Sequence, residues 1–94
     1  MLYLILAHDA TDDQAPARRQ RVRPRHLEGV RPLVDEGRLQ VAGALLDEEG
    51  VMRGSMLLLE AEGEAEVRTI LERDVYAREG VWARFEIWPF ARAV

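Results

Sequence analysis

Short apolar runs alternate with amphipathic stretches along the first half of the chain. The run at residues 2–8 is apolar and aromatic, ends at Asp9, and is typical of a β-strand. Over about residues 17–36, apolar side chains recur on one side of a helix with about 3.6 residues per turn, and Gly37 is a stop signal. Pro24 leaves the start of this helix open, because the helix either begins at the proline or has an earlier turn that is kinked there.

The second half of the chain shows the same alternation of strands and helices. Residues 39–46 are typical of a strand, and the acidic turn at 47–50 separates them from a third apolar run at 53–61, so these runs predict a hairpin. Residues 64–73 are acidic in the first turn and basic near the end, which indicates a second helix. Residues 81–90 are rich in β-branched and aromatic side chains and predict a fourth strand.

This order of elements predicts an α+β fold. A strand, helix, strand, strand, helix, strand sequence is the ferredoxin-like βαββαβ arrangement, an antiparallel sheet with two helices on one face, formed here by a single domain over residues 1–94. The first strand is apolar on both faces, with Tyr3 and Ile5 on one and Leu4 and Leu6 on the other. Two helices cover only one face, so we expect a homodimer whose sheets pack face to face.

Composition and charge narrow the classes of partner. The chain has 94 residues, of which 48% are hydrophobic and 32% charged, with a net charge of -4 and no apolar stretch long enough to span a membrane. Five arginines fall within residues 18–25, but no aromatic residues are interleaved to stack on bases, so we expect neither nucleic acid nor membrane as a partner. The apolar start lacks a basic flank, which favours a cytoplasmic protein without a signal peptide.

Several kinds of chemistry have no sequence support. The chain has no cysteine, no glycine-rich phosphate-binding motif, and only two histidines, His8 and His26, so we expect no metal and no cofactor. Ser55 is the only serine and does not lie in the Gly-x-Ser-x-Gly motif of a nucleophilic hydrolase. A hydroxyl that binds a small-molecule ligand is the better interpretation of Ser55.

One histidine and one aspartate are predicted to face the sheet. His26 lies in the apolar sector of the first helix with Arg23 near the same side, and by itself it is as well explained as a satisfied core residue. Asp74 continues the apolar series of the second helix toward the sheet, at a C-terminus where the helix dipole disfavours an anion. It is either a solvated loop residue or the partner of His26 and Arg23, because a carboxylate packed against the sheet needs a cation or a donor.

The residues beneath this helix suggest a pocket. Ala42, Gly43 and Ala44 are small and leave volume above the sheet. In such a pocket His26 could transfer a proton while Asp74 fixes its tautomer. Arg23 could hold an anionic oxygen of the ligand. Asp9, at the end of the first strand, is a weaker candidate for the same pocket, and the face shared by Trp82, Trp88 and Phe90 is assigned to packing.

A set of motifs spread over nearly the whole chain resembles those of a known family. The motifs are Met-Leu-Tyr-Leu-Ile-Leu-Ala-His-Asp at 1–9, Val-Arg-Pro-Arg-His-Leu at 22–27, Asp-Glu-Gly-Arg-Leu at 35–39 leading into Ala42-Gly43, Gly54-Ser55, Asp-Val-Tyr at 74–76, Gly80-Val81, and Pro89-Phe90. On these residues the chain resembles the YciI-like, or YCII-related, family of small dimeric α/β-barrel proteins.

The resemblance implies a fold, an assembly and a site. It implies a ferredoxin-like monomer, a dimer, and an active site centred on His26 and Asp74, with Arg23, Ser55 and Tyr76 lining the same pocket. It also implies lyase-type chemistry such as dehydrochlorination of hydroxylated aromatic rings, or isomerase chemistry. We therefore expect a cofactor-free enzyme that transfers a proton on a small cyclic oxygenated substrate; the alternative is a non-catalytic dimeric module that binds or senses a small metabolite.

Overall fold

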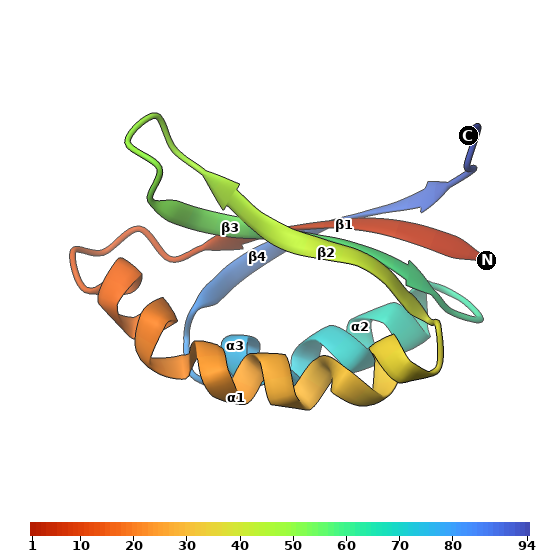
Figure 1. Ribbon diagram of the computed structural model, residues 1–94, viewed down its shortest axis with the longest axis horizontal. Helices are drawn as coiled ribbons and strands as arrows, with labels where there is room; N and C mark the ends of the chain where they lie inside the picture. Colours follow the sequence, from red (N-terminus) through yellow and green to blue (C-terminus); the bar gives the residue numbers. More distant parts are fainter.

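One antiparallel sheet lies against a single layer of helices in the computed structural model, which describes residues 1–94 (Figure 1). The elements in chain order are β1 (Leu2–Asp9), α1 (Ala15–Asp35), β2 (Leu39–Leu46), β3 (Met52–Glu60), α2 (Glu64–Arg73), α3 (Val75–Arg78) and β4 (Trp82–Phe90). The predicted order of strands and long helices and the α+β class are confirmed. The short helix α3 was not predicted, because so few residues cannot show a helical period.

The sheet has the strand order β2-β3-β1-β4, and every neighbouring pair is antiparallel. Strands β1 and β3 are therefore central, and β2 and β4 form the edges. All three helices lie on the same side of the sheet, where the sequence predicts two, and α1 runs below β2 (Figure 1). No helix has the length and apolar character needed to cross a membrane.

Helix α1 continues through both of its interior prolines, Pro24 and Pro32. It begins at Ala15, with Pro16 in the first turn, where a missing N–H is tolerated. Of the two alternatives left open for Pro24, a helix that begins at this proline is therefore wrong. Both interior prolines are exposed, so the carbonyl groups that lose a helical donor there face water.

The two alternating apolar sets of β1 lie on opposite faces of the sheet, in the way the pattern predicts. Tyr3 and Ile5 are buried against the helices, whereas Leu4 and Leu6 are half-buried on the other surface, which carries no helix and is called the open face below. Trp88 faces the same way as Leu4, its pairing partner, and is 58% exposed. The single chain thus leaves apolar side chains in contact with water on its open face.

A bulge in β4 overturns the prediction that Trp82, Trp88 and Phe90 share one face. His8 pairs with Arg84 while the next residue, Asp9, pairs with Trp82, so β4 carries one extra residue at this point. An extra residue reverses the direction of every side chain beyond it. Trp82 therefore points toward the helices and is buried, whereas Trp88 remains on the open face.

Candidate active site

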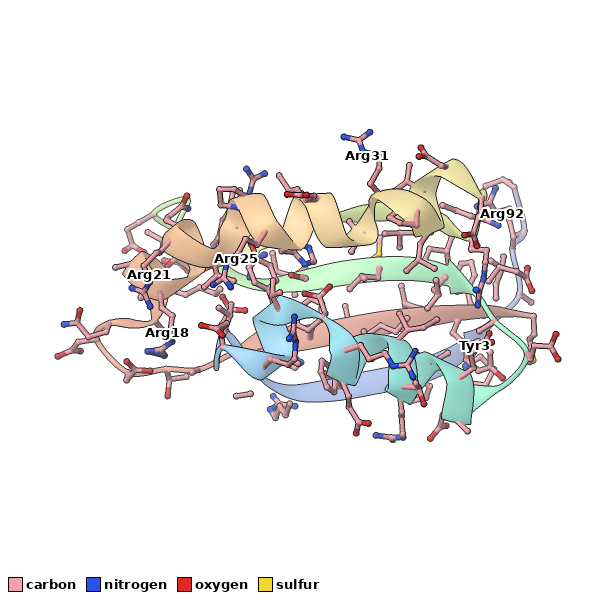
Figure 2. All side chains as sticks on the ribbon, turned by 90° about the horizontal axis from the view of Figure 1, so that it is seen from below. Tyr3, Arg18, Arg21, Arg25, Arg31 and Arg92 are labelled. Atoms are coloured by element: carbon pink, nitrogen blue, oxygen red, sulfur yellow. The ribbon has the colours of Figure 1, made fainter.

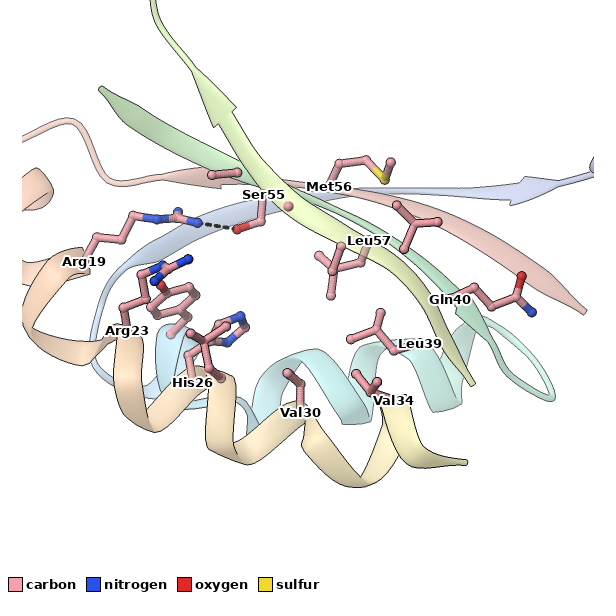
Figure 3. A pocket seen from close by; sticks show the side chains of 16 residues that line it. Arg19, Arg23, His26, Val30, Val34, Leu39, Gln40, Ser55, Met56 and Leu57 are labelled. Carbon is pink, nitrogen blue, oxygen red and sulfur yellow. Dashed lines mark hydrogen bonds between the residues drawn. The ribbon is translucent and has the colours of Figure 1, made fainter. Parts of the chain in front are cut away.

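A cavity of about 350 Å³ lies between α1 and the strands β2 and β3, over the small residues at 42–44 that predicted it (Figure 3). This volume falls in the range of small-molecule sites. Most of the wall is apolar, with contributions from Val30, Leu39 and Leu57 among others. Arg19, Arg23, His26 and Ser55 converge at one end, called the polar end below, and Gln40 lies toward the opposite end (Figure 3). The cavity therefore has a mostly apolar body and a group of cationic and hydrogen-bonding side chains at the polar end.

The His26 ring is held from behind by Asp74. Nδ1 of His26 lies 2.8 and 2.9 Å from the two carboxylate oxygens of Asp74, and the two side chains are only 12% and 10% exposed. Asp74 does not line the cavity, whereas His26 does. Because Nδ1 is taken by the carboxylate and Nε2 has no partner in the chain, Nε2 is the ring atom available to a ligand.

Asp74 has the predicted place at the end of α2 and a second role that was not predicted. It follows the last residue of α2 and is the N-cap of α3, where its Oδ1 accepts a hydrogen bond of 2.9 Å from the backbone N–H of Tyr76. A carboxylate is favoured at a helix N-terminus by the capping bond and by the dipole. The predicted place at the C-terminus of α2 is confirmed, and the carboxylate is nevertheless stabilised there because the chain begins a new helix at the same residue.

Two aromatic residues hold the imidazole in place. The ring of Tyr76 stacks on His26 at 3.9 Å between centroids and 9° between planes, and Trp82 meets the same ring edge-on at 5.5 Å. Tyr76 comes from α3 and Trp82 from the bulged start of β4. Burial raises the pKa of the Tyr76 hydroxyl, which has no hydrogen-bond partner, so this phenol is neutral at physiological pH.

A second buried pair lies beside the first. Nη1 of Arg19 donates to both carboxylate oxygens of Asp9 at 2.8 and 2.9 Å, and Nη2 donates to Oγ of Ser55 at 2.8 Å. The same Oγ accepts a bond of 3.1 Å from Nε1 of Trp82. Burial raises the pKa of Asp9, and the adjacent Arg19 guanidinium opposes that shift. These four side chains form one connected network at the polar end of the cavity.

Two members of this network, Arg19 and Trp82, were missed by the sequence analysis. Arg19 is 3% exposed, whereas Arg21 and Arg31 of the same helix extend into solvent (Figure 2). The burial of Arg19 could have been predicted from the sequence, because this residue lies three positions before the buried Val22 and thus on the same helix face. Trp82 could not be placed without the bulge.

The structure brings most of the predicted site residues together. The residues in the cavity wall are Arg23, His26, Ser55 and Tyr76. Asp74 and Asp9 do not line the cavity: Asp74 contacts the wall residues His26 and Tyr76, and Asp9 contacts Arg19. Arg23 points into the cavity (Figure 3) and makes no ion pair. No three His, Cys, Asp or Glu side chains come together anywhere in the chain as a metal site would require.

Comparison with known proteins gives concordant matches over nearly the full chain. The sequence model of the YCII-related domain matches residues 1–91. Fusaric acid biosynthesis protein 2 of Gibberella moniliformis is 32% identical, with 94% of this chain and 90% of that protein covered. Protein YciI of Escherichia coli is 33% identical over 98% of each chain.

A solved structure agrees with the same fold. The structure of 5-chloro-2-hydroxyhydroquinone dehydrochlorinase (TftG) from Burkholderia phenoliruptrix, in complex with 2,5-dihydroxybenzoquinone, superposes with a TM-score of 0.84 and 28% sequence identity. The match covers 99% of this chain and 96% of that one. The antiparallel sheet with its layer of helices is therefore an arrangement that this chain shares with that dehydrochlorinase.

Proposed function

The chain belongs to the YCII-related domain family, and on this premise we propose that it is an enzyme that transfers a proton on a small cyclic oxygenated substrate. The observation that carries the proposal is the pair of short contacts between Nδ1 of His26 and the carboxylate of Asp74 at the wall of a ligand-sized cavity. His26 is the proposed catalytic acid or base, and Asp74 is the residue that positions it.

This contact determines which ring nitrogen of the neutral imidazole carries the proton. An ionised carboxylate only accepts hydrogen bonds, so Asp74 stabilises the tautomer of His26 that carries its proton on Nδ1. The lone pair of Nε2 is then free toward the cavity, as a general base requires. When Nε2 takes a proton, the positive charge of the imidazolium lies directly beside the Asp74 carboxylate, which stabilises it.

The reaction class rests on the similarity to TftG, whose name describes a dehydrochlorination. In an elimination of this kind a base removes a proton, the electron pair that held the proton forms a new double bond, and the leaving group departs with its own pair. His26 supplies such a base here. The same group can return the proton to another atom of the substrate, which would give an isomerisation; we propose a lyase or isomerase that works without a cofactor.

The cavity suits a ring with oxygen substituents. Apolar side chains such as Val30 and Leu57 form its body, and Arg23 and Ser55 lie where an oxygen of the ring would reach the polar end. Tyr76 adds an aromatic surface to the same wall. Apolar walls with few convergent polar groups are typical of small-molecule sites.

We also propose that the active form is a homodimer whose open faces pack together into an α/β barrel. Exposed apolar side chains on that face, of which Trp88 is the largest, support this assembly because a second copy would remove them from water. Sedimentation of the purified protein tests it. Trp88→Arg is expected to convert the dimer into a folded monomer, and a monomeric wild-type protein would contradict the proposal.

Turnover of 5-chloro-2-hydroxyhydroquinone, followed by chloride release, tests the proposed chemistry. His26→Gln should lower the rate by roughly 100-fold to 10,000-fold, the usual contribution of a general acid or base. His8→Gln is the matched control, because His8 contacts Glu86 at 2.6 Å on the open face, away from the cavity. Full turnover by His26→Gln would contradict the proposal, and a wild-type protein that binds such rings without converting them would support the binding-module alternative.

A further inference from the structure

The hydroxyl of Ser55 has only one way left to make a hydrogen bond. Its oxygen accepts from Nη2 of Arg19 at 2.8 Å and from Nε1 of Trp82 at 3.1 Å, which uses both of its lone pairs. Neither of these donors can reverse the direction of its bond, because guanidinium and indole N–H groups do not accept. The hydroxyl proton has no acceptor in the chain, so Ser55 can offer a ligand a donor and nothing else.

The surroundings of Ser55 fix this polarity. Asp9 holds Nη1 of Arg19 with two short bonds, and the side chains of this ion pair are each only 4% exposed. The neighbours of Ser55 across the sheet are Ala7 and Ala44, whose small side chains leave the hydroxyl accessible from the cavity. Ser55 is thus held by a buried charge pair rather than by a mobile surface group.

The charges at this end of the cavity favour a negative ligand. No carboxylate is among the residues that line the cavity. Asp9 compensates the charge of Arg19, and Asp74 faces the ring of His26 from behind. Arg23 is the cation without an anionic partner, and it points inward. Arg23 is an exposed residue, so it is not a buried unpaired charge, but a bound oxyanion would add a charge-assisted hydrogen bond to it.

We propose that Ser55 is the specificity-determining donor of this site, that Arg19 is a positioning residue acting through Ser55, and that the site selects the oxyanion of an acidic phenol or enol. The inference rests on the proposed function, because it names the form in which the substrate of that site binds. A neutral hydroxyl can accept from Ser55, but its own proton then needs another acceptor, such as Nε2 of His26, and it gains less from the charge of Arg23 than an anion does. The anion accepts from Ser55 and lies beside Arg23, and its electron-rich ring is already prepared for proton transfer at carbon by His26.

The probe for this inference is 4-nitrophenol, which is colourless when neutral and yellow when ionised. Excess protein at a pH where both forms are present should increase the yellow anion and lower the apparent pKa of the bound probe by about one unit, since a hydrogen bond to a charged group is worth roughly tenfold or more in affinity. The groups that face the probe are Arg19, Arg23 and His26 from α1 and Tyr76 from α3.

Three variants separate the parts of the network. Ser55→Ala removes the donor and should cancel most of the shift. Trp82→Phe frees one lone pair of Ser55, so the neutral phenol can donate to it and the shift should shrink while the probe still binds. Arg19→Lys keeps a cation for Asp9 but removes the Nη2 hydrogen bond to Ser55, so it should also make the pKa shift of the probe smaller. Thr69→Ala, which removes an exposed hydroxyl of α2, should leave the shift unchanged.

Each outcome bears on the inference separately from the proposed function. A shift in the wild type that falls in Ser55→Ala and Trp82→Phe, with melting temperatures showing that both variants are folded, would support the inference. A probe that binds with an unchanged or raised pKa would overturn it, although proton transfer on a neutral ring would still stand. A probe that does not bind to the wild type would overturn the inference and remove the support for a ring-binding site.

Discussion

Two largely buried carboxylate pairs join α1 to the rest of the molecule, and they differ in the cation. Asp9 pairs with Arg19 at 2.8 Å, and Asp74 pairs with His26 at the same distance. The first pair is more deeply buried, with both side chains 4% exposed against 12% and 10% in the second. Arginine keeps its charge at every physiological pH, whereas histidine exchanges its proton near neutrality. One pair is therefore a fixed support, and the other is the proposed proton-transfer pair.

The two pairs also differ in what lies beyond the cation. Nη2 of Arg19 donates a hydrogen bond to Ser55 and so orients a hydroxyl in the cavity wall. His26 lines the cavity itself, and its Nε2 has no hydrogen-bond partner in the chain. In the proposed function, the fixed ion pair would orient the ligand through Ser55 and leave His26 free for proton transfer.

The largest effect is expected when the fixed pair is broken. Arg19→Met leaves the buried Asp9 without its cation, which should lower the free energy of unfolding by about 3–5 kcal/mol, measured by urea denaturation. The double variant Asp9→Asn with Arg19→Met removes both charges and should recover most of this loss. A cost below about 1 kcal/mol for Arg19→Met alone would show that the two pairs are equivalent in stability.

A smaller effect is expected from the corresponding change in the second pair. His26→Gln leaves Asp74 with its capping bond from the backbone N–H of Tyr76, so the carboxylate is not left unsatisfied. The free energy of unfolding should fall by about 1 kcal/mol, through lost packing against Tyr76, although the proposed turnover should fall far more. A loss as large as that of Arg19→Met would place His26 among the structural supports instead.

The smallest effect is expected from an exposed pair in the turn between β2 and β3. The hydrogen bond from Arg53 lowers the pKa of Asp47 from its ordinary value of 3.8, and backbone N–H groups add to the effect. A folded-state pKa below the unfolded one means that this contribution is present above pH 3.8 and is lost as the pH falls further. Asp47→Ala should therefore remove a small stabilisation at neutral pH and none in strong acid, as thermal melts at both pH values would show.

The contrast between the two pairs also shows how far the sequence could lead. His26 and Asp74 were predicted because each continues an apolar helical series, although the capping role of Asp74 required a helix too short to produce a pattern. Arg19 has the same helical spacing, but an arginine among four others in the same segment is typical of a solvated surface. The burial of Arg19 depends on its ion pair with Asp9, which lies at the end of β1 and not on the helix itself.

The position of Trp82 depended on a still less local feature. A single extra residue in β4 decides which face of the sheet Trp82 occupies, and only the pairing of β4 with β1 reveals it. The overall order of elements needs no such information, because hydrophobic periodicity and turn residues specify it locally. The sequence therefore predicts the fold better than it predicts the half of the site that rests on long-range contacts.

The most direct test of the central claim is the position of the proton on the neutral His26 ring, read from its two nitrogen-15 resonances. His8→Gln leaves a single histidine to assign, and Asp74→Asn is the comparison because asparagine also caps a helix. We predict that the proton is on Nδ1 in the presence of Asp74 and that a substantial share moves to Nε2 in Asp74→Asn. A proton found on Nε2 with Asp74 present, or one that ignores the substitution, would contradict the assignment of Asp74 and His26 as a proton-transfer pair.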